Sequence, residues 1–151
     1  EYMVNIFLTK PLGKFLSLLG YEVFVDRDTL IYYDLTLGRT QRVWIADDCS
    51  GIYSMLIFLS LFMSYIIVDY QKLDYMSTGF FFLGIMAAYF ENILRMAVII
   101  LAGHYWGGDA LYWTHINAGW LIFTSWLLIF WLIIIKMHGF DHFRYHPIRY
   151  F

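Results

Sequence analysis

The chain contains one cysteine, Cys49, and only two prolines among its 151 residues. A single cysteine cannot form a disulfide within the chain or supply a cysteine-rich metal cage. Charged residues are also scarce, at 15% compared with about 25% in ordinary soluble domains. The formal net charge of -2 provides no basic surface of the kind that nucleic acids require. These shortages exclude an internally cross-linked scaffold and argue against a nucleic-acid partner.

Hydrophobic residues take the place of the missing charges. They make up 61% of the chain, and 22% of all residues are aromatic. Three stretches, residues 51–68, 76–103 and 116–135, are close to or above the length of about 20 apolar residues that crosses a bilayer. We therefore expect an all-α membrane protein with about three transmembrane helices, an N-terminal interfacial helix and a small extracytoplasmic β region.

The N-terminal segment departs from the pattern of a spanning helix. Residues 2–19 are mostly apolar, but Lys10, Pro11 and Lys14 interrupt them. A proline inside a spanning helix needs compensation from neighbouring groups. We expect one or two helical pieces that lie at the membrane interface, with the lysines towards the headgroups. A fourth crossing by this segment is the alternative.

A segment with strand character follows, over residues 21–48. Its sections 21–25, 29–37 and 41–45 are rich in β-branched and aromatic residues, and Asp-Arg-Asp and Gly-Arg-Thr turns separate them. This pattern predicts a small antiparallel sheet or two hairpins outside the bilayer. The chain thus divides into a membrane-associated N-terminal helix (1–20), the β region (21–48), a transmembrane helical core (49–135) and a cytoplasmic tail (136–151).

Cys49 stands directly before the first long apolar stretch. A thiolate is a strong nucleophile, and a helix N-terminus can lower the pKa of a thiol. The alternative is a small packing residue, because cysteines are often buried in protein cores. If the first helix crosses the bilayer and the second returns, then Cys49, Arg95 and His115 all belong to the same membrane face.

Arg95 lies inside the second apolar stretch, where a charge costs about 2.5–3.5 kcal/mol near the helix centre. Such a residue normally faces protein or water and has a partner. Glu91 is four residues earlier on the same helical face, which predicts an intramembrane ion pair. The functional alternative is a cation that stabilises a thiolate or a developing oxyanion, with Asn92 orienting it or binding a substrate carbonyl.

His115 is the candidate general acid or base. It stands at the expected start of the third helix and could exchange a proton with Cys49, or simply bond water at the interface. His104 competes for this role from the preceding connector, residues 104–113, which is aromatic and glycine-rich.

Metal and cofactor sites are not expected. Three histidines of the tail are spaced by four and could gather a metal on a helix, but a solvated tail is the simpler interpretation; they are His138, His142 and His146. A glycosidase carboxylate pair, a glycine-rich phosphate loop and a cysteine-pair zinc motif are not apparent. The candidate chemistry therefore rests on the protein's own side chains.

At these residues the chain resembles the exosortase/archaeosortase family of membrane transpeptidases. The matching elements are Cys49-Ser50-Gly51-Ile52 at the opening of a membrane helix, Asn92-Ile93-Leu94-Arg95 late in the next, and His115 with Gly119 at the opening of the last. Their order along the chain is the family's order, and the resemblance covers about residues 20–135.

The resemblance implies an enzyme that recognises a C-terminal sorting signal composed of a short motif, a membrane helix and a basic cluster. It also implies cleavage at the motif and transfer of the new carboxyl end to an acceptor. In this scheme Cys49 is the nucleophile, His115 the acid or base, and Arg95 the group that stabilises the oxyanion or thiolate. Asn92 and Ser50 would bind or orient the substrate.

The partners implied are membrane-anchored proteins that carry such signals, together with membrane lipids. The location implied is the cytoplasmic membrane, with several crossings and the active-site face outside the cytoplasm. The positive-inside rule agrees, because it assigns the basic tail with Lys136, Arg144 and Arg149 to the cytoplasm. A second function stays open, in which the chain is a non-catalytic small subunit that packs within a larger membrane protein complex.

Overall fold

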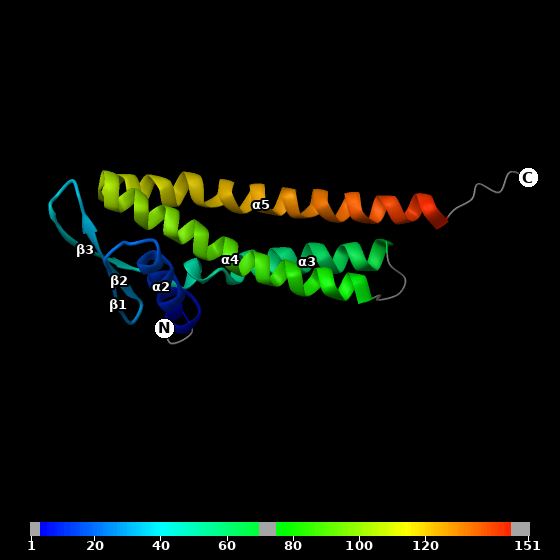
Figure 1. Ribbon diagram of the computed structural model, residues 1–151, viewed down its shortest axis with the longest axis horizontal. Helices are drawn as coiled ribbons and strands as arrows, with labels where there is room; N and C mark the ends of the chain where they lie inside the picture. The colour runs from blue at the N-terminus through cyan, green and yellow to red at the C-terminus, as the bar shows by residue number, and fades with distance from the viewer. Residues whose placement is uncertain (1–3, 70–74, 146–151) are drawn as a thin grey trace, which may run out of the picture.

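Three long helices run beside one another and carry a small sheet and a short helix at one end (Figure 1). The computed structural model describes residues 4–69 and 75–145, with side chains described throughout except at 47, 48, 68, 69, 76, 77 and 138–145. The elements are η1 (Asn5–Thr9), α2 (Lys10–Leu18), β1 (Val23–Asp26), β2 (Thr29–Asp34), β3 (Arg39–Trp44), η2 (Asp47–Ser50), α3 (Ile52–Asp69), α4 (Tyr75–Trp106) and α5 (Gly108–Tyr145).

The N-terminal segment is helical and amphipathic. The π-helical turns of η1 run directly into α2, where Pro11 occupies the first turn and so leaves no backbone donor unpaired. Leu12 and Leu16 are fully buried, whereas Lys10 and Lys14 are exposed. This division gives the helix one face for the protein core and one basic face.

The predicted antiparallel sheet is present, with three strands in the order β1-β2-β3. Its register pairs Val25 with Leu30, and Leu30 with Val43. Along β2, Leu30 and Tyr32 are buried while Tyr33 is exposed, as alternation across a strand requires. One face of the sheet therefore covers the protein, and the other carries exposed aromatic side chains.

The sheet is attached to the second half of α4. The Leu35 amide donates a hydrogen bond of 2.9 Å to the His104 carbonyl. The Tyr32 hydroxyl lies so close to Gly103 that a Cβ there would approach it to 2.7 Å. These contacts fix the height of the β region along the long helix.

Among the described residues, buried hydrophobic side chains form two separate cores at different positions along the long helices. The first joins α2 and the sheet to the second half of α4, and its buried residues include Leu12, Leu30, Ile45, Met96 and Ile100. The second joins α3 to α5 through Phe58, Phe62, Phe130 and Ile134. At Gly84 of α4 the Phe58 ring occupies the space that a Cβ would need, so α3 and α4 approach closely there.

The third helix is longer than the sequence predicted. The expected connector 104–113 is reduced to the single residue Gly107, which has φ +85°. The Gly107 amide donates a 3.0 Å hydrogen bond to the Gly103 carbonyl at the end of α4. Glycine adopts this left-handed conformation without strain, and Asp109 in the first turn of α5 complements the helix dipole. The expected helix start near residue 116 is therefore wrong.

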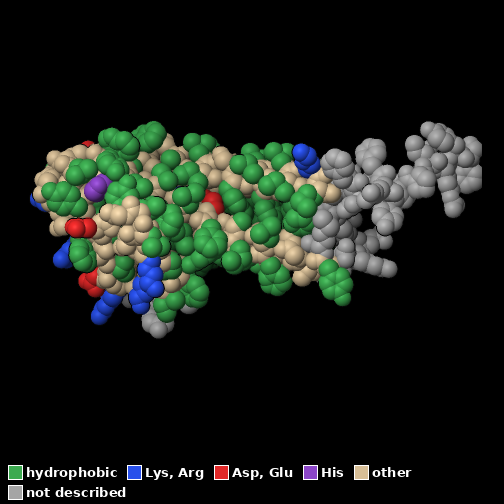
Figure 2. Space-filling view, in the orientation of Figure 1, with side chains coloured by type: hydrophobic (Ala, Val, Ile, Leu, Met, Phe, Trp, Pro, Cys, Tyr) green, Lys and Arg blue, Asp and Glu red, His purple; other side chains and the backbone are tan. Residues whose placement is uncertain are grey.

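Among the described residues, two helices are long and apolar enough to cross a membrane, namely 78–106 within α4 and 108–137 within α5. A shorter apolar helix covers residues 52–67 of α3. Figure 2 shows that lysine, arginine, aspartate and glutamate side chains gather at the end that carries the sheet and α2. The surface over the described helices towards the other end is mainly hydrophobic (Figure 2).

Candidate functional site

The site begins where the sheet leads into α3. The Ile45 amide donates a 2.8 Å hydrogen bond to the Asp28 carbonyl, which ties the end of β3 to the first hairpin. Cys49 lies in the single 3₁₀ turn η2, and its amide donates a 3.0 Å hydrogen bond to the Ala46 carbonyl. The turn carries Cys49 from the edge of the sheet to the first turn of a long apolar helix.

Gly51 and Ser50 determine the backbone geometry at the junction between η2 and α3. Gly51 has φ +84°, a conformation that costs most other residues about 1–2 kcal/mol. A Cβ on Gly51 would also lie 2.8 Å from the Asn92 side chain. Ser50 Oγ accepts a long hydrogen bond, 3.4 Å, from the Ile52 amide at the start of α3. Ser50 therefore caps a helix, and Gly51 permits close contact between η2 and α4.

Asn92 connects Cys49 to Arg95. Its Nδ2 donates a 3.1 Å hydrogen bond to the Cys49 carbonyl, and its Oδ1 accepts a 2.8 Å hydrogen bond from Arg95 Nη2. The Asn92 side chain is 2% exposed, so these bonds lie away from solvent. The amide thus uses one donor and its acceptor to hold a cysteine backbone and a guanidinium together.

Arg95 also faces α5. A Cβ on Gly119 would lie 3.7 Å from Arg95 Cδ, so the backbone of α5 passes beside the arginine side chain. Arg95 Nε is buried and has no hydrogen-bond partner within the described ranges. Buried donors are normally paired, so this unpaired nitrogen is an exception among the described residues.

The sequence-based ion pair between Glu91 and Arg95 is not formed. Both Glu91 carboxylate oxygens are buried without a hydrogen-bond partner among the described side chains and backbone groups. Arg95 donates instead to Asn92, three residues earlier on α4. The helical spacing puts both Glu91 and Asn92 within reach of Arg95. Asn92, which also bonds the Cys49 carbonyl, is the residue that accepts the hydrogen bond from Arg95.

His115 does not begin the last helix, as expected, but lies about two turns inside α5. Its side chain is exposed. It is four residues before Gly119 and therefore on the same face of α5 as the glycine that meets Arg95. Hydrogen bonds thus join Cys49, Asn92 and Arg95, and His115 lies one helical turn before the glycine that meets Arg95.

Comparison with protein-family models gives one match, to transmembrane exosortase, over residues 4–132. The chain belongs to the transmembrane exosortase family. No curated protein and no solved structure matches it significantly. The family resemblance that the sequence motifs suggested is confirmed, and the match includes the N-terminal helix as well as the site.

In this exosortase-family chain, His104 is committed to the fold. Its ring Nδ1 donates to the Tyr33 carbonyl, and its backbone carbonyl accepts from Leu35. The ring also makes an edge contact with Tyr21, with centroids 5.3 Å apart. These bonds hold the β2 end against α4, so His104 has little freedom to act as an acid or base.

The described part of the chain contains no group of three or more metal-ligating side chains. Of the tail histidines, the side chains of 138 and 142 and the whole of residue 146 lie outside the described residues.

No feature of the sequence indicated that Asn92 would bind the main chain of Cys49. The glycine directly before an apolar helix was the available signal for a close approach at residue 51.

Proposed function

We propose that the chain is a membrane-embedded cysteine transpeptidase or protease that cleaves C-terminal sorting signals of membrane-anchored proteins and passes the cleaved protein to an acceptor. The observation that carries the proposal is the hydrogen-bonded connection from the Cys49 carbonyl through Asn92 to Arg95. It places a nucleophilic residue type beside a cation with an unpaired buried donor. Membership in the exosortase family supports the same chemistry.

The reaction has two halves. The Cys49 thiolate adds to the scissile carbonyl carbon, and the resulting oxyanion is stabilised by the Arg95 guanidinium. Collapse breaks the carbon–nitrogen bond, the leaving amine takes a proton from His115, and a thioester remains on Cys49. An amine or hydroxyl of the acceptor then attacks the thioester, gives its proton to His115 and releases Cys49.

Asn92 is a positioning residue in this scheme. It fixes one Arg95 Nη group by accepting its hydrogen bond, which leaves Nε free to meet an oxyanion. Pre-set donors of this kind are effective because they need little reorganisation during the reaction. His115 is proposed to act on the leaving group and on the acceptor, since it lies on α5 one turn before the glycine that meets Arg95.

The site is proposed to lie at the outer boundary of the membrane. Asn92 is about 26 Å along α4 from Tyr75, at 1.5 Å per residue, compared with a hydrocarbon core about 30 Å thick. Beyond Asn92, α4 packs against the sheet and α2. Open sheet edges do not occur in lipid, so this half of α4 belongs outside the hydrocarbon layer.

The proposed arrangement has three crossings, with the sheet outside the cytoplasm. The C-terminal end of α3, the N-terminal end of α4 and the C-terminal end of α5 lie together at the opposite end of the molecule (Figure 1). That end also carries Lys136, in agreement with the positive-inside rule. Labelling of Cys49 by a membrane-impermeant thiol reagent in intact cells tests the orientation, and labelling only after permeabilisation would reverse it.

Capture of the acyl-enzyme tests the function itself. A sorting-signal peptide incubated with the full chain should become attached to Cys49 through a hydroxylamine-sensitive thioester, detected by mass spectrometry of the modified peptide. The Cys49→Ser chain should give no hydroxylamine-sensitive product. A chain that cleaves no signal and is isolated with large partners in fixed ratio would point to the non-catalytic subunit.

A further inference from the structure

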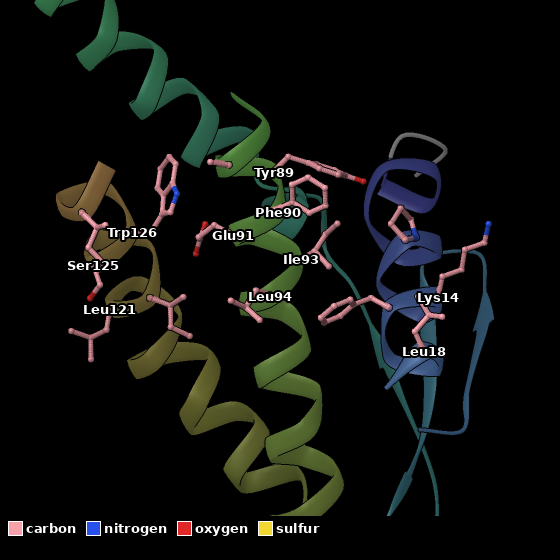
Figure 3. A pocket seen from close by; sticks show the side chains of 15 residues that line it. Lys14, Leu18, Tyr89, Phe90, Glu91, Ile93, Leu94, Leu121, Ser125 and Trp126 are labelled. Atoms are coloured by element: carbon pink, nitrogen blue, oxygen red, sulfur yellow. The ribbon is translucent and has the colours of Figure 1, made fainter. Parts of the chain in front are cut away.

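A groove of about 1020 Å³ lies between α2, α4 and α5. Its floor is the α4 face with Phe90 and Leu94, which are 59% and 51% exposed. Figure 3 shows α2, with Lys14 and Leu18, on one side and α5, with Leu121 and Trp126, on the other. A volume of this size lies at the upper end of the range for small-molecule pockets, and the walls are nearly all apolar.

Polar groups in the lining include the exposed Lys14, the Ser125 hydroxyl and the buried Glu91 carboxylate. Glu91 is 6% exposed and lies in the α5 side of the groove, near Ser125 and Trp126 (Figure 3). Neither carboxylate oxygen has a hydrogen-bond partner in the part of the chain that the structure describes. The Arg95 guanidinium, the nearest cation along α4, donates to Asn92 instead.

Because the Glu91 carboxyl group has no partner among the described residues, a ligand that fills the groove is favoured if it supplies a hydrogen-bond donor. Acyl chains of lipids match the walls, but they provide no donor and leave the full desolvation cost of Glu91 in place. A symmetric dimer would bring the same groove of a second copy onto this one, so an acceptor would face an acceptor. A foreign helix with an apolar surface and one donor side chain satisfies both the walls and the carboxyl group.

We propose that this groove receives the membrane-anchor helix of the substrate, with a hydrogen-bond donor of that helix bound to Glu91. The proposal rests on the proposed function, whose substrates carry such a helix after the cleavage motif. The donor is the side chain of a serine, threonine, tryptophan, lysine or arginine that lies at the depth of Glu91.

The height of the groove agrees with this assignment. Its lining on α4 ends at Leu94, directly before Arg95, and its lining on α5 begins at Leu121, two residues after Gly119. A helix that leaves the groove in the outward direction therefore passes the level at which Arg95 meets Gly119. The segment preceding the anchor, which is the segment to be cleaved, is thereby delivered to the height of the site.

Site-specific photo-cross-linking tests the proposal in the full chain in membranes. A benzophenone amino acid replaces Leu94 in the groove or, as the control, Leu128, which is 60% exposed on α5 and outside the groove lining. The co-expressed probe is a reporter protein that ends in a sorting signal. We expect adducts with the reporter's anchor helix from position 94 and few from position 128. Equal adducts from both positions, or adducts only with lipid or with a second copy, would overturn the proposal.

Two variants of Glu91 examine the hydrogen bond. Glu91→Gln keeps an acceptor oxygen and should retain the adduct at position 94. Glu91→Leu removes it and should lower the adduct yield about threefold, the average effect of one side-chain hydrogen bond between membrane helices. An unchanged yield for Glu91→Leu, in a chain present at normal level, would remove Glu91 from the recognition.

The same membranes separate this proposal from the function on which it rests. With Cys49→Ala added, reporter cleavage should stop while the adduct from position 94 persists. Cysteine-dependent cleavage without a groove adduct would leave the transpeptidase in place and reject the groove. A groove adduct with cleavage that does not depend on Cys49 would reject the proposed chemistry and retain the docking surface.

Discussion

The side-chain amide of Asn92 donates to the main-chain carbonyl of Cys49 at 3.1 Å, so α4 holds the backbone of the cysteine in place. The same amide accepts from Arg95 at 2.8 Å. One buried asparagine therefore fixes the distance between the first two motifs of the family, which are more than forty residues apart in sequence.

Asn92→Ala should destabilise the chain by about 1–3 kcal/mol, because the Cys49 carbonyl and one Arg95 donor lose their buried partner. Thermal unfolding in detergent measures the effect. Asn117→Ala is a matched control, since the Asn117 amide bonds only the Trp113 carbonyl one turn earlier on α5. Equal melting temperatures for the two variants would show that the Asn92 connection contributes nothing special.

Gly51→Ala should be damaging for two reasons, the positive φ and the contact with Asn92. The backbone alone accounts for about 1–2 kcal/mol. Gly119→Ala should instead be tolerated or slightly stabilising, because its Cβ would have ordinary contact with Arg95 and alanine favours helix by about 1 kcal/mol. Membrane levels and melting temperatures of the pair measure this, and the reverse order would contradict the geometry at η2.

Arg95→Lys should lower signal cleavage by about 10²-fold, the usual effect of losing one preorganised oxyanion donor. Lysine keeps the positive charge but lacks the planar fork that binds Asn92 and an oxyanion together. Cleavage of a co-expressed reporter is the assay, and Arg42→Lys on the exposed strand β3 is the control for arginine replacement. Near-normal cleavage by Arg95→Lys would remove the fork geometry from the mechanism.

Asp34 should make the turn between β2 and β3 sensitive to acid. The Thr36 hydroxyl, followed by the amides of Leu37 and Thr36, lowers the pKa of the Asp34 carboxyl below its usual value. The stabilisation is therefore present above the unfolded pKa of about 3.9 and disappears as the pH falls through the lower folded value. Hydrogen exchange of the amides of residues 36 and 37 should accelerate in that range, relative to the intrinsic exchange rate.

Asp34→Asn isolates the titration in the same measurement. Asparagine still offers Oδ1 to Thr36 and Leu37 but carries no titrating group. Its amides should show no change in protection through the acidic range. A variant that loses protection in parallel with the native chain would assign the acid sensitivity to another group.

The sheet and the first two long helices were predictable because their signals are local. β-Branched and aromatic residues at 29–34 and 39–44 favour strands, and the uncharged run after Gly51 favours a helix. The length of α5 was not predictable from hydropathy. Its first two turns, before Ile116, contain polar and aromatic residues that resemble a connector, and Gly107 alone ends the preceding helix.

The candidate site divides in the same way. The alternation of helix directions predicted that Cys49 and Arg95 would lie towards the same end of the helices, and the hydrogen bonds through Asn92 agree. Helical spacing favoured Glu91 as the partner of Arg95, but spacing carries no information about a loop that packs on α4. His115 was expected at the start of the last helix but lies about two turns inside α5, and its role as acid or base stays a prediction.

The most direct test of the account is reporter processing by the Cys49→Ala chain, measured as loss of the C-terminal membrane anchor from a co-expressed substrate. The account predicts that processing stops while the chain stays at normal level in the membrane, because no acyl-enzyme can form without the thiol. Cys49→Ser should leave little activity, since a hydroxyl is a poorer nucleophile without a strong base. Normal processing by a stable Cys49→Ala chain would contradict the assignment of Cys49 as the nucleophile.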